Sequence, residues 1–389
     1  MFDDVVRTDP RPATHLESSF RFLNRVSGPY WEQVRALVQD WLNQVQDDAA
    51  YRDLRARMRS DNAPNYSAFL ELYLHEMLRR AGYRLTIHPD VPGSTNHPDF
   101  LVEGHGESFY LEATMPGPRG GATGAGQRRA AFLDTMQGVR SKNFYLSLDE
   151  LVVGPRPLRG TVVRDAVDRW LSSLDPDRLS WERSSQEPFR WAKDGWEVQF
   201  TALPVSPQHR GKPDHRPLGI YADLAASFDD DGAIIRNAVA AKAGRYGVGD
   251  VPLVVAVGTF IWDHDHWDST NAFYGHDVLV LNDMGPEAVA GTRTRSSDGY
   301  FGVPPLWRNE KVAAILHVNQ LQPHHVQRAE VTLWPHPAST RLPSLPSRIP
   351  GSAIRFDAGE LAVSPPPFGA REHFALSEPW PDGDAFPGT

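Results

Sequence analysis

The chain has 389 residues, of which 40% are hydrophobic and 23% are charged, so it can supply roughly two or three domains with substantial cores. It contains no cysteine, which excludes disulfides, thiolate metal sites, thiol nucleophiles and iron–sulfur clusters. A net charge of −9 argues against a broad basic face for long duplex DNA, although a small basic groove is compatible with it. The chain starts with acidic and polar residues, and its longest apolar run, 251–262, is too short to span a bilayer. We therefore expect a soluble, cytoplasmic protein that makes no membrane contact.

The N-terminal part of the chain reads as helical. Apolar residues at helical spacing predict a helix over 30–45, and a second, arginine-rich helix is expected over about 49–59. A third helix is predicted over about 67–81, because its apolar residues share one face and Gly82 follows them.

The hydrophobic period then changes from helical to alternating. Residues 83–88, 98–103 and 108–114 are predicted to be three short strands, with a turn at 104–106 between the last two. A helix followed at once by three strands is the most informative pattern in the chain.

A glycine-rich loop at 116–127, interpreted as a lid or connector, follows the third strand. Beyond it the patterns predict helix 128–139, strand 143–153, helix 160–174 and strand 196–203. Helix 232–246 then leads into 251–257, which is apolar on both faces and is expected to be a central strand covered by helices. Two further strands are predicted at 312–318 and 331–334.

These patterns divide the chain into three parts. We expect an N-terminal helical segment over 1–63, an α/β domain over 64–342 and a proline-rich tail over 343–389. The domain is expected to carry a large insertion at about 115–230 and extra strands within 312–334. The nine prolines of the tail predict that it is extended and irregular.

Two acidic residues on the predicted strands are the strongest candidates for chemistry. Asp99 opens the second strand, and Glu112 lies near the end of the third, on the same face as Thr114. If the two strands form a hairpin in register, both carboxylates converge within reach of one divalent ion. Mg²⁺ needs one or two carboxylates and keeps its other positions for water and phosphate oxygens. Bound there, it would lower the pKa of a water and stabilise charge on a phosphodiester.

Helix, three strands and the residues Pro98-Asp99 … Glu112-Ala113-Thr114 together resemble the PD-(D/E)XK, or restriction-endonuclease-like, superfamily. The resemblance covers about 65–115, with 232–246 and 251–258 as the closing helix and strand. It implies an αβββαβ core with a mixed sheet and a nuclease dependent on Mg²⁺ or Mn²⁺. The substrate implied is DNA, and the implied role is restriction or phage defence. A homodimer or a complex with a partner protein is also implied.

The resemblance carries site residues only where the motif matches. Asp99 and Glu112 match the two strand carboxylates and are the expected metal ligands. Glu71 on the preceding helix is the best match for a third carboxylate and is expected as a third metal ligand, with Glu76 as second choice. Thr114 stands where the family usually has lysine, and threonine cannot supply a positive charge to the transition state.

Another cation must therefore fill this gap if the site is catalytic. The chain has only five lysines against 35 arginines, which draws attention to each lysine. Lys242, in an alanine-rich helix before the buried strand, is the candidate, and Lys142 is the alternative.

Several alternatives stay open at this stage. Asp99 also suits a strand-end cap, Glu112 a solvated edge position, and Glu71 and Lys242 ordinary exposed helix positions. A second hypothesis is a nuclease-like scaffold that has lost its chemistry and binds nucleic acid or a partner protein, which the Thr114 departure favours.

Two further segments carry weaker signals. The segment 262–268 suits a metal hydrolase through His264 and His266, or a loop whose aspartates cap the next helix. From Pro118 to Lys142 there are five basic residues and one acid, which suits either phosphate contacts or a solvated helix face.

Overall fold

The computed structural model describes residues 1–116, 124–180, 187–211, 218–221, 231–245, 251–263, 265–281, 291–341, 343–357 and 360–387. These residues form two compact units. The main unit comprises Met1–Thr8, Leu23–Pro116 and Asp230–Ala385. The second unit comprises Asp9–Phe22, Gly117–Asp229 and Phe386–Thr389. Each unit has its own hydrophobic cluster, and each is described separately.

The N-terminal helices are α1 (Ser19–Arg25), α2 (Pro29–Asn43), α3 (Asp48–Met58) and α4 (Asn62–Arg80). They confirm the three predicted helices, with ends shifted by a few residues. Helix α3 starts at Asp48 because the Asp47 side chain accepts hydrogen bonds from the N–H groups of Ala49 and Ala50. Helices α2, α3 and α4 contact one another within the main unit, where Trp41 of α2 stacks on Phe69 of α4.

An eight-stranded mixed sheet forms the centre of the main unit. Its strands, in spatial order, are β1 (Arg84–Ile87), β2 (Phe100–Gly104), β3 (Glu107–Thr114), β8 (Leu253–Thr259), β13 (Val312–Asn319), β14 (Glu330–Pro335), β15 (Ser352–Asp357) and β16 (Glu360–Ser364). The first three strands are antiparallel, whereas β3, β8 and β13 run parallel. The mixed α/β class is thereby confirmed, and all six strands predicted for this part of the chain, including those at 312–318 and 331–334, lie in this sheet.

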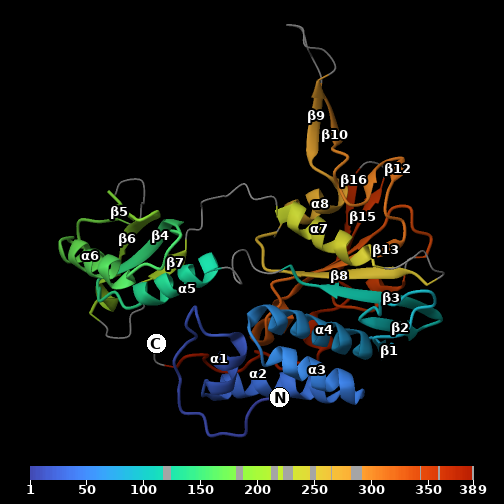
Figure 1. Ribbon diagram of the computed structural model, residues 1–389, viewed down its shortest axis with the longest axis horizontal. Helices are drawn as coiled ribbons and strands as arrows, with labels where there is room; N and C mark the ends of the chain where they lie inside the picture. Colours follow the sequence, from blue (N-terminus) through green and yellow to red (C-terminus); the bar gives the residue numbers. More distant parts are fainter. Residues whose placement is uncertain are drawn as a thin grey trace. The chain divides into compact units, whose positions relative to one another are not determined.

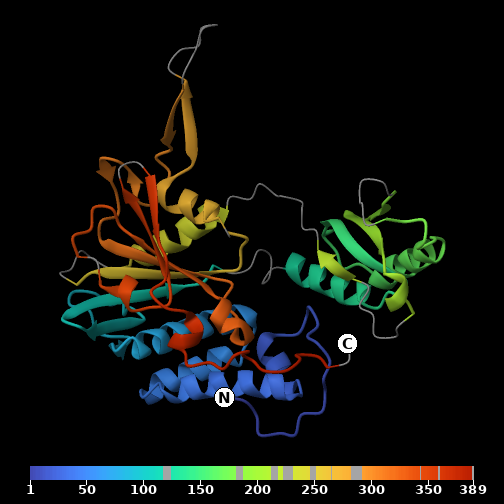
Figure 2. The same ribbon diagram turned by 180° about the vertical axis from the view of Figure 1, so that it is seen from behind.

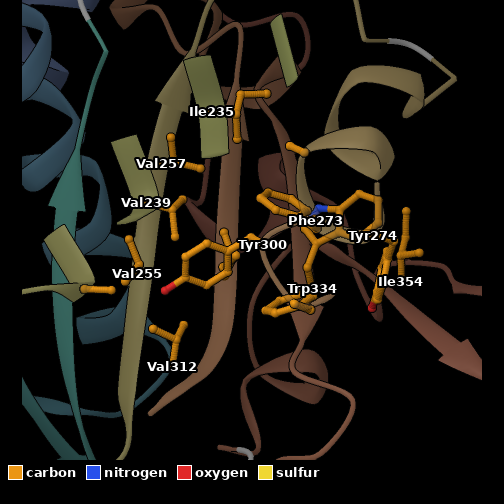
Figure 3. Packing of buried hydrophobic residues seen from close by; sticks show 14 of the residues in the cluster. Ile235, Val239, Val255, Val257, Phe273, Tyr274, Tyr300, Val312, Trp334 and Ile354 are labelled. Carbon is orange, nitrogen blue, oxygen red and sulfur yellow. The ribbon is translucent and has the colours of Figure 1, made fainter. Parts of the chain in front are cut away.

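Helices cover both faces of this sheet (Figure 1). Helix α4 packs on one face against β1 and β3, and α7 (Asp231–Ala243) packs on the other against β3 and β8. Every residue of β8 is buried, as its two-sided apolar sequence predicts. On the α7 face, Val239 of α7 lies against Val255 of β8, and Tyr300 and Trp334 extend the same core (Figure 3).

The remaining elements of the main unit lie beyond this core. They are α8 (Trp267–Tyr274), the hairpin β9 (Asp277–Leu281) and β10 (Gly291–Arg295), the short pair β11 (Gly302–Val303) and β12 (Leu306–Trp307), two 3₁₀ turns, η3 (Pro323–Arg328) and η4 (Leu345–Ser347), and α9 (Ala370–His373). Seen from behind, the β9–β10 hairpin projects away from the main sheet (Figure 2). None of the helices within the described ranges is long and apolar enough to cross a bilayer.

The prediction of an irregular tail is wrong for part of 343–389. Strand β15 pairs in parallel with β14, and β16 pairs antiparallel with β15, so both extend the central sheet. Ile354 is 1% exposed within the core, and Phe374 near the end of α9 is equally well buried at 2%. The prolines do not prevent this, because they flank the two strands and leave every ladder N–H intact.

The second unit is a four-stranded sheet with two helices. The strands, in spatial order, are β5 (Phe189–Lys193), β6 (Trp196–Pro204), β4 (Phe144–Val152) and β7 (Leu218–Tyr221); the helices are α5 (Gly124–Met136) and α6 (Gly160–Ser172), and a 3₁₀ turn η2 (Pro207–His209) follows β6. The predicted helices and strands of this segment are confirmed, whereas β5 and β7 were not predicted. Its core includes Met136, Phe144, Val163 and Phe200.

Candidate active site

Asp99 and Glu112 are held together where β2 and β3 begin to separate. The β2–β3 ladder ends at the pair Phe100↔Leu111, and Asp99 directly precedes β2. Beyond the ladder, hydrogen bonds between backbone N–H groups and the two carboxylates replace the backbone pairing. The Asp99 N–H donates to Glu112 Oε2 at 3.1 Å, and Asp99 Oδ2 accepts from the Ala113 N–H at 2.6 Å. This reciprocal contact fixes both carboxylates at one end of the hairpin.

Lys242 joins the two carboxylates from the helix that covers this face. Strand alternation turns Glu112 towards α7, and its carboxylate is almost completely buried. Lys242 Nζ donates to Glu112 Oε1 at 2.7 Å, and a guanidinium nitrogen of Arg245 lies 3.8 Å from the same oxygen. A buried carboxylate needs a charged partner in this way, since an unpaired charge in the interior is strongly unfavourable.

The environment of Asp99 favours its protonated form. Burial, followed by the nearby charges of Glu71 and Glu112, raises the pKa of Asp99 to about 7, although Lys242 acts in the opposite direction. The Asp99 side chain is 15% exposed, so it is partly open to solvent. A carboxyl group crowded by two other acids is typical of a site that a cation can occupy.

Besides burial, the charge of Glu71 contributes to the raised pKa of Asp99, but the Glu71 carboxylate is paired with Arg57. It lies on α4, is 8% exposed, and pairs with both guanidinium nitrogens of Arg57 at 2.8 and 2.5 Å. Glu76, the second choice, pairs with Arg79 and Arg80 on its own helix. The structure therefore brings Asp99, Glu112 and Lys242 into contact, with Glu71 as a neighbour.

Thr114 ends β3 opposite Val257, on the same side of the strand as Glu112. Lys242, 130 residues away in the sequence, places an ammonium beside Glu112. Lys142, the alternative cation, lies in the second unit.

Three basic neighbours of the cluster were not predicted. Arg245 is three residues after Lys242, so helical spacing was a usable signal for it. Arg57 on α3 reaches Glu71 only through helix packing, which no local pattern reveals. His88 has a left-handed φ of 46° and places Nε2 3.9 Å from Asp99 Oδ1.

A divalent ion fits this donor set in part. Within the described ranges, no group of three or more histidine or acidic side chains is arranged to hold a metal ion. Asp99 and Glu112 alone still meet the requirement of Mg²⁺ for one or two carboxylates with water and phosphate oxygens. Burial is the main cause of the raised pKa of Asp99, and the charges of Glu71 and Glu112 add to it, so a cation bound here would favour the ionised carboxylate.

The segment after β8 behaves as a helix cap. Asp263 Oδ1 accepts from the N–H of Asp268 at 2.8 Å at the start of α8, as the capping alternative predicts. His266 packs edge-on against Trp334, with the ring centres 6.0 Å apart. His264 lies outside the described residues, as do 117–123 of the glycine-rich loop.

The chain was compared with protein-family models, with curated proteins and with solved structures, and none of these matches it.

Proposed function

We propose that the main unit is a divalent-metal-dependent nuclease of the PD-(D/E)XK type that hydrolyses phosphodiester bonds of DNA. The order of elements supports this assignment. Helix α4 is followed by the antiparallel strands β1, β2 and β3, and α7 then leads to β8, which runs parallel to β3. This is the αβββαβ order that the resemblance implies, with the second unit inserted after β3.

The observation that carries the proposal is the contact of Lys242 with Glu112 beside Asp99. Lysine is rare in this chain, and a long-range contact brings this one to the strand carboxylates. A purely structural pair would satisfy both charges. Here the neighbouring Asp99 remains crowded by acids and partly exposed. Unresolved negative charge beside a fixed ammonium suits a site that binds a cation and a phosphate together.

The chain's residues have distinct tasks in this proposal. Asp99 and Glu112 would hold a Mg²⁺ or Mn²⁺ ion, which supplies an acidified water and charge stabilisation when bound. Lys242 pairs with Glu112 and would offer an ammonium to a phosphoryl oxygen as negative charge develops. Arg245, with its side chain 53% exposed, offers a second cation to the incoming phosphodiester.

Cleavage by carboxylate variants tests the proposal. We expect Asp99→Asn and Glu112→Gln to lose at least about 10³-fold in Mg²⁺- or Mn²⁺-dependent DNA cleavage, because several kcal/mol of charge stabilisation depend on the ion. Glu103→Gln is the matched control, since Glu103 lies on β2 and pairs only with the exposed Arg84 among described residues. Cleavage that persists in purified Asp99→Asn and Glu112→Gln proteins would overturn the assignment.

A second candidate function is a nuclease-like scaffold that binds nucleic acid or a partner protein without cleaving. The observation that favours it is that both Glu112 oxygens and both Glu71 oxygens already have protein partners. Mn²⁺ titration by calorimetry separates the two functions. A nuclease site binds Mn²⁺ in the unmodified protein and loses binding in Asp99→Asn, whereas a scaffold binds none at this position.

A further inference from the structure

We infer that the second unit binds nucleic-acid backbone phosphates in a cavity of about 460 Å³ between the start of β4 and helix α6. Its lining includes the loop residues Arg140, Ser141, Lys142 and Asn143, together with Asp168 and Ser172 of α6. This inference deepens the proposed function, on which it rests for the identity of the ligand. It assigns a task to a unit that contains none of Asp99, Glu112 and Lys242.

The charges in this cavity are available to a ligand. Arg140 and Lys142 are exposed, and across the described ranges their side chains form no ion pair or hydrogen bond. Asp168 is the one acid in the lining, and its Oδ1 accepts from the Arg140 N–H at 2.8 Å. The cavity therefore presents two cations to solvent against one carboxylate that is already engaged.

The loop offers four consecutive side chains of the types that contact phosphates. Arginine, lysine, serine and asparagine are all among the residue types whose side chains donate hydrogen bonds to phosphate oxygens in protein–DNA complexes. Ser141 Oγ accepts from the Phe144 N–H at 3.1 Å, which leaves its hydroxyl hydrogen to donate outward. Donors spread along a loop, with no closed pocket of buried donors, suit successive phosphates of a chain better than one small anion.

The surrounding structure holds the loop in place before any ligand arrives. Phe144 is buried in the core of the unit directly after the loop, and Asp168 ties the loop to α6. The Gly211 N–H also donates to the Lys142 carbonyl at 3.2 Å. A loop fixed in this way loses little conformational entropy on binding.

Charge distribution along the chain supports the same conclusion. Residues 117–229 contain 16 lysines and arginines against 14 acids, whereas the rest of the chain contains 24 against 35. The segment is thus slightly basic within an acidic protein. A nucleic acid would be drawn to this segment in preference to the rest of the chain.

Binding of labelled DNA in the presence of EDTA tests the inference without cleavage. The probes are a short fluorescein-labelled duplex and its single strand, and the readout is fluorescence anisotropy between about 0.05 and 0.3 M salt. We expect Arg140→Ala/Lys142→Ala to lower the slope of log K against log [salt] by about 2 and to weaken binding roughly tenfold per lost contact at about 0.1 M salt. Lys142→Arg should bind almost as the unmodified protein does.

Lys193→Ala is the matched control, because Lys193 is an exposed lysine of the same unit at the end of β5, outside the cavity. Equal binding and equal salt slopes for the double variant and the unmodified protein would overturn the inference, as would equal weakening by Lys193→Ala. Saturable binding of inorganic phosphate without any DNA binding would also overturn it. A protein that binds DNA through Lys142 but cleaves none would contradict the proposed function alone.

Discussion

Two buried polar clusters lie on the central sheet of the main unit, and they differ in how completely their charges are satisfied. The first is the carboxylate site of Asp99, Glu112 and Lys242. The second, called here the polar network, consists of Thr259, Asp263, Ser269, His317 and Asn319, with Glu330 at its end. Both place acidic side chains beside other polar groups in the interior. Both also contain residue types that occur in catalytic sites.

Every member of the polar network is bonded to the next. The Ser269 hydroxyl contacts Asp263 Oδ2 and lies 2.9 Å from His317 Nδ1, while His317 Nε2 lies 2.7 Å from Thr259 Oγ1. Thr259 then donates to Asn319 at 2.8 Å. Burial lowers the pKa of His317 to about 3, so the ring is neutral, and its exposed fraction is 2%. A serine, a histidine and an aspartate thus meet in the interior, each with 2% or less of its surface exposed.

The carboxylate site is satisfied less completely. Lys242 neutralises Glu112, but Asp99 remains beside two other acids and open to solvent at 15% of its side-chain surface. A buried polar network that is fully hydrogen-bonded helps to specify the fold, whereas a site whose charges are not fully paired lowers stability and is typical of functional sites. The contrast teaches that residue types alone do not mark a functional site, and that accessible, unbalanced charge is the better guide.

Loss of the ammonium from the first cluster should have a large effect, second only to that of the carboxylate variants described above. Replacing Lys242 with Met should lower the rate of DNA cleavage about 10²- to 10³-fold, because it removes the cation that contacts Glu112, one of the two proposed metal ligands. Lys242→Arg should restore part of the rate, since it keeps the charge. Single-turnover cleavage with Mg²⁺ measures both.

Lys311→Met is the control for this prediction, because Lys311 is the only other lysine in the sequence of the main unit and lies outside the cluster. Urea denaturation of each variant shows whether Lys242→Met is still folded. A folded Lys242→Met protein that cleaves at the unmodified rate would contradict the role given to this ammonium.

A smaller effect is expected from breaking the polar network. Ser269→Ala removes the hydroxyl between Asp263 and His317 and leaves buried polar atoms without that partner. The free energy of unfolding should fall by about 1–3 kcal/mol, with cleavage by the folded protein unchanged. Urea denaturation and cleavage rates, measured with Ser60→Ala as an exposed serine control, test this. A loss of cleavage in stable Ser269→Ala protein would show that the network has a catalytic role.

Most of the central sheet could be predicted from local sequence. Alternation in 108–114 and the two-sided apolar run at 251–257 report burial directly, so β3 and β8 were found. Strand β15 was missed because the high proline content of the tail outweighed a short alternating stretch at 352–356. Strand β7 was not predicted because its four residues, Leu-Gly-Ile-Tyr, do not alternate between apolar and polar types, so periodicity does not identify it.

The site could be predicted to a different extent for each residue. Asp99 and Glu112 follow from strand order and register, which are properties of neighbouring residues. Lys242 was inferred because a cation was missing and lysines are few. The pairing of Glu71 with Arg57 could not be predicted, because it depends on how α3 packs on α4. Contacts between separate helices have no signature in the spacing of either helix.

The smallest predicted effect is the contribution of Asp99 to the pH dependence of the free energy of unfolding. Folding raises the pKa of Asp99 from 3.8 to about 7, so the folded protein binds a proton that the unfolded chain has released. Stability of the metal-free protein should therefore fall as pH rises between these two values. From pH 6 to pH 7 the fall due to Asp99 should be about 1 kcal/mol, because a full proton corresponds to about 1.4 kcal/mol per pH unit.

Urea denaturation of the unmodified protein and Asp99→Asn in EDTA isolates this contribution, since the histidines and other acids titrate in both proteins. The difference between the two free energies should change with pH in the stated direction and level off above about pH 8, where the folded Asp99 carboxyl is ionised. Mn²⁺ should remove the decline in the unmodified protein only, because a bound cation favours the ionised carboxylate. A difference that stays constant from pH 5 to pH 8 would show that the acids around Asp99 are already neutralised, and the contrast between the two clusters would then disappear.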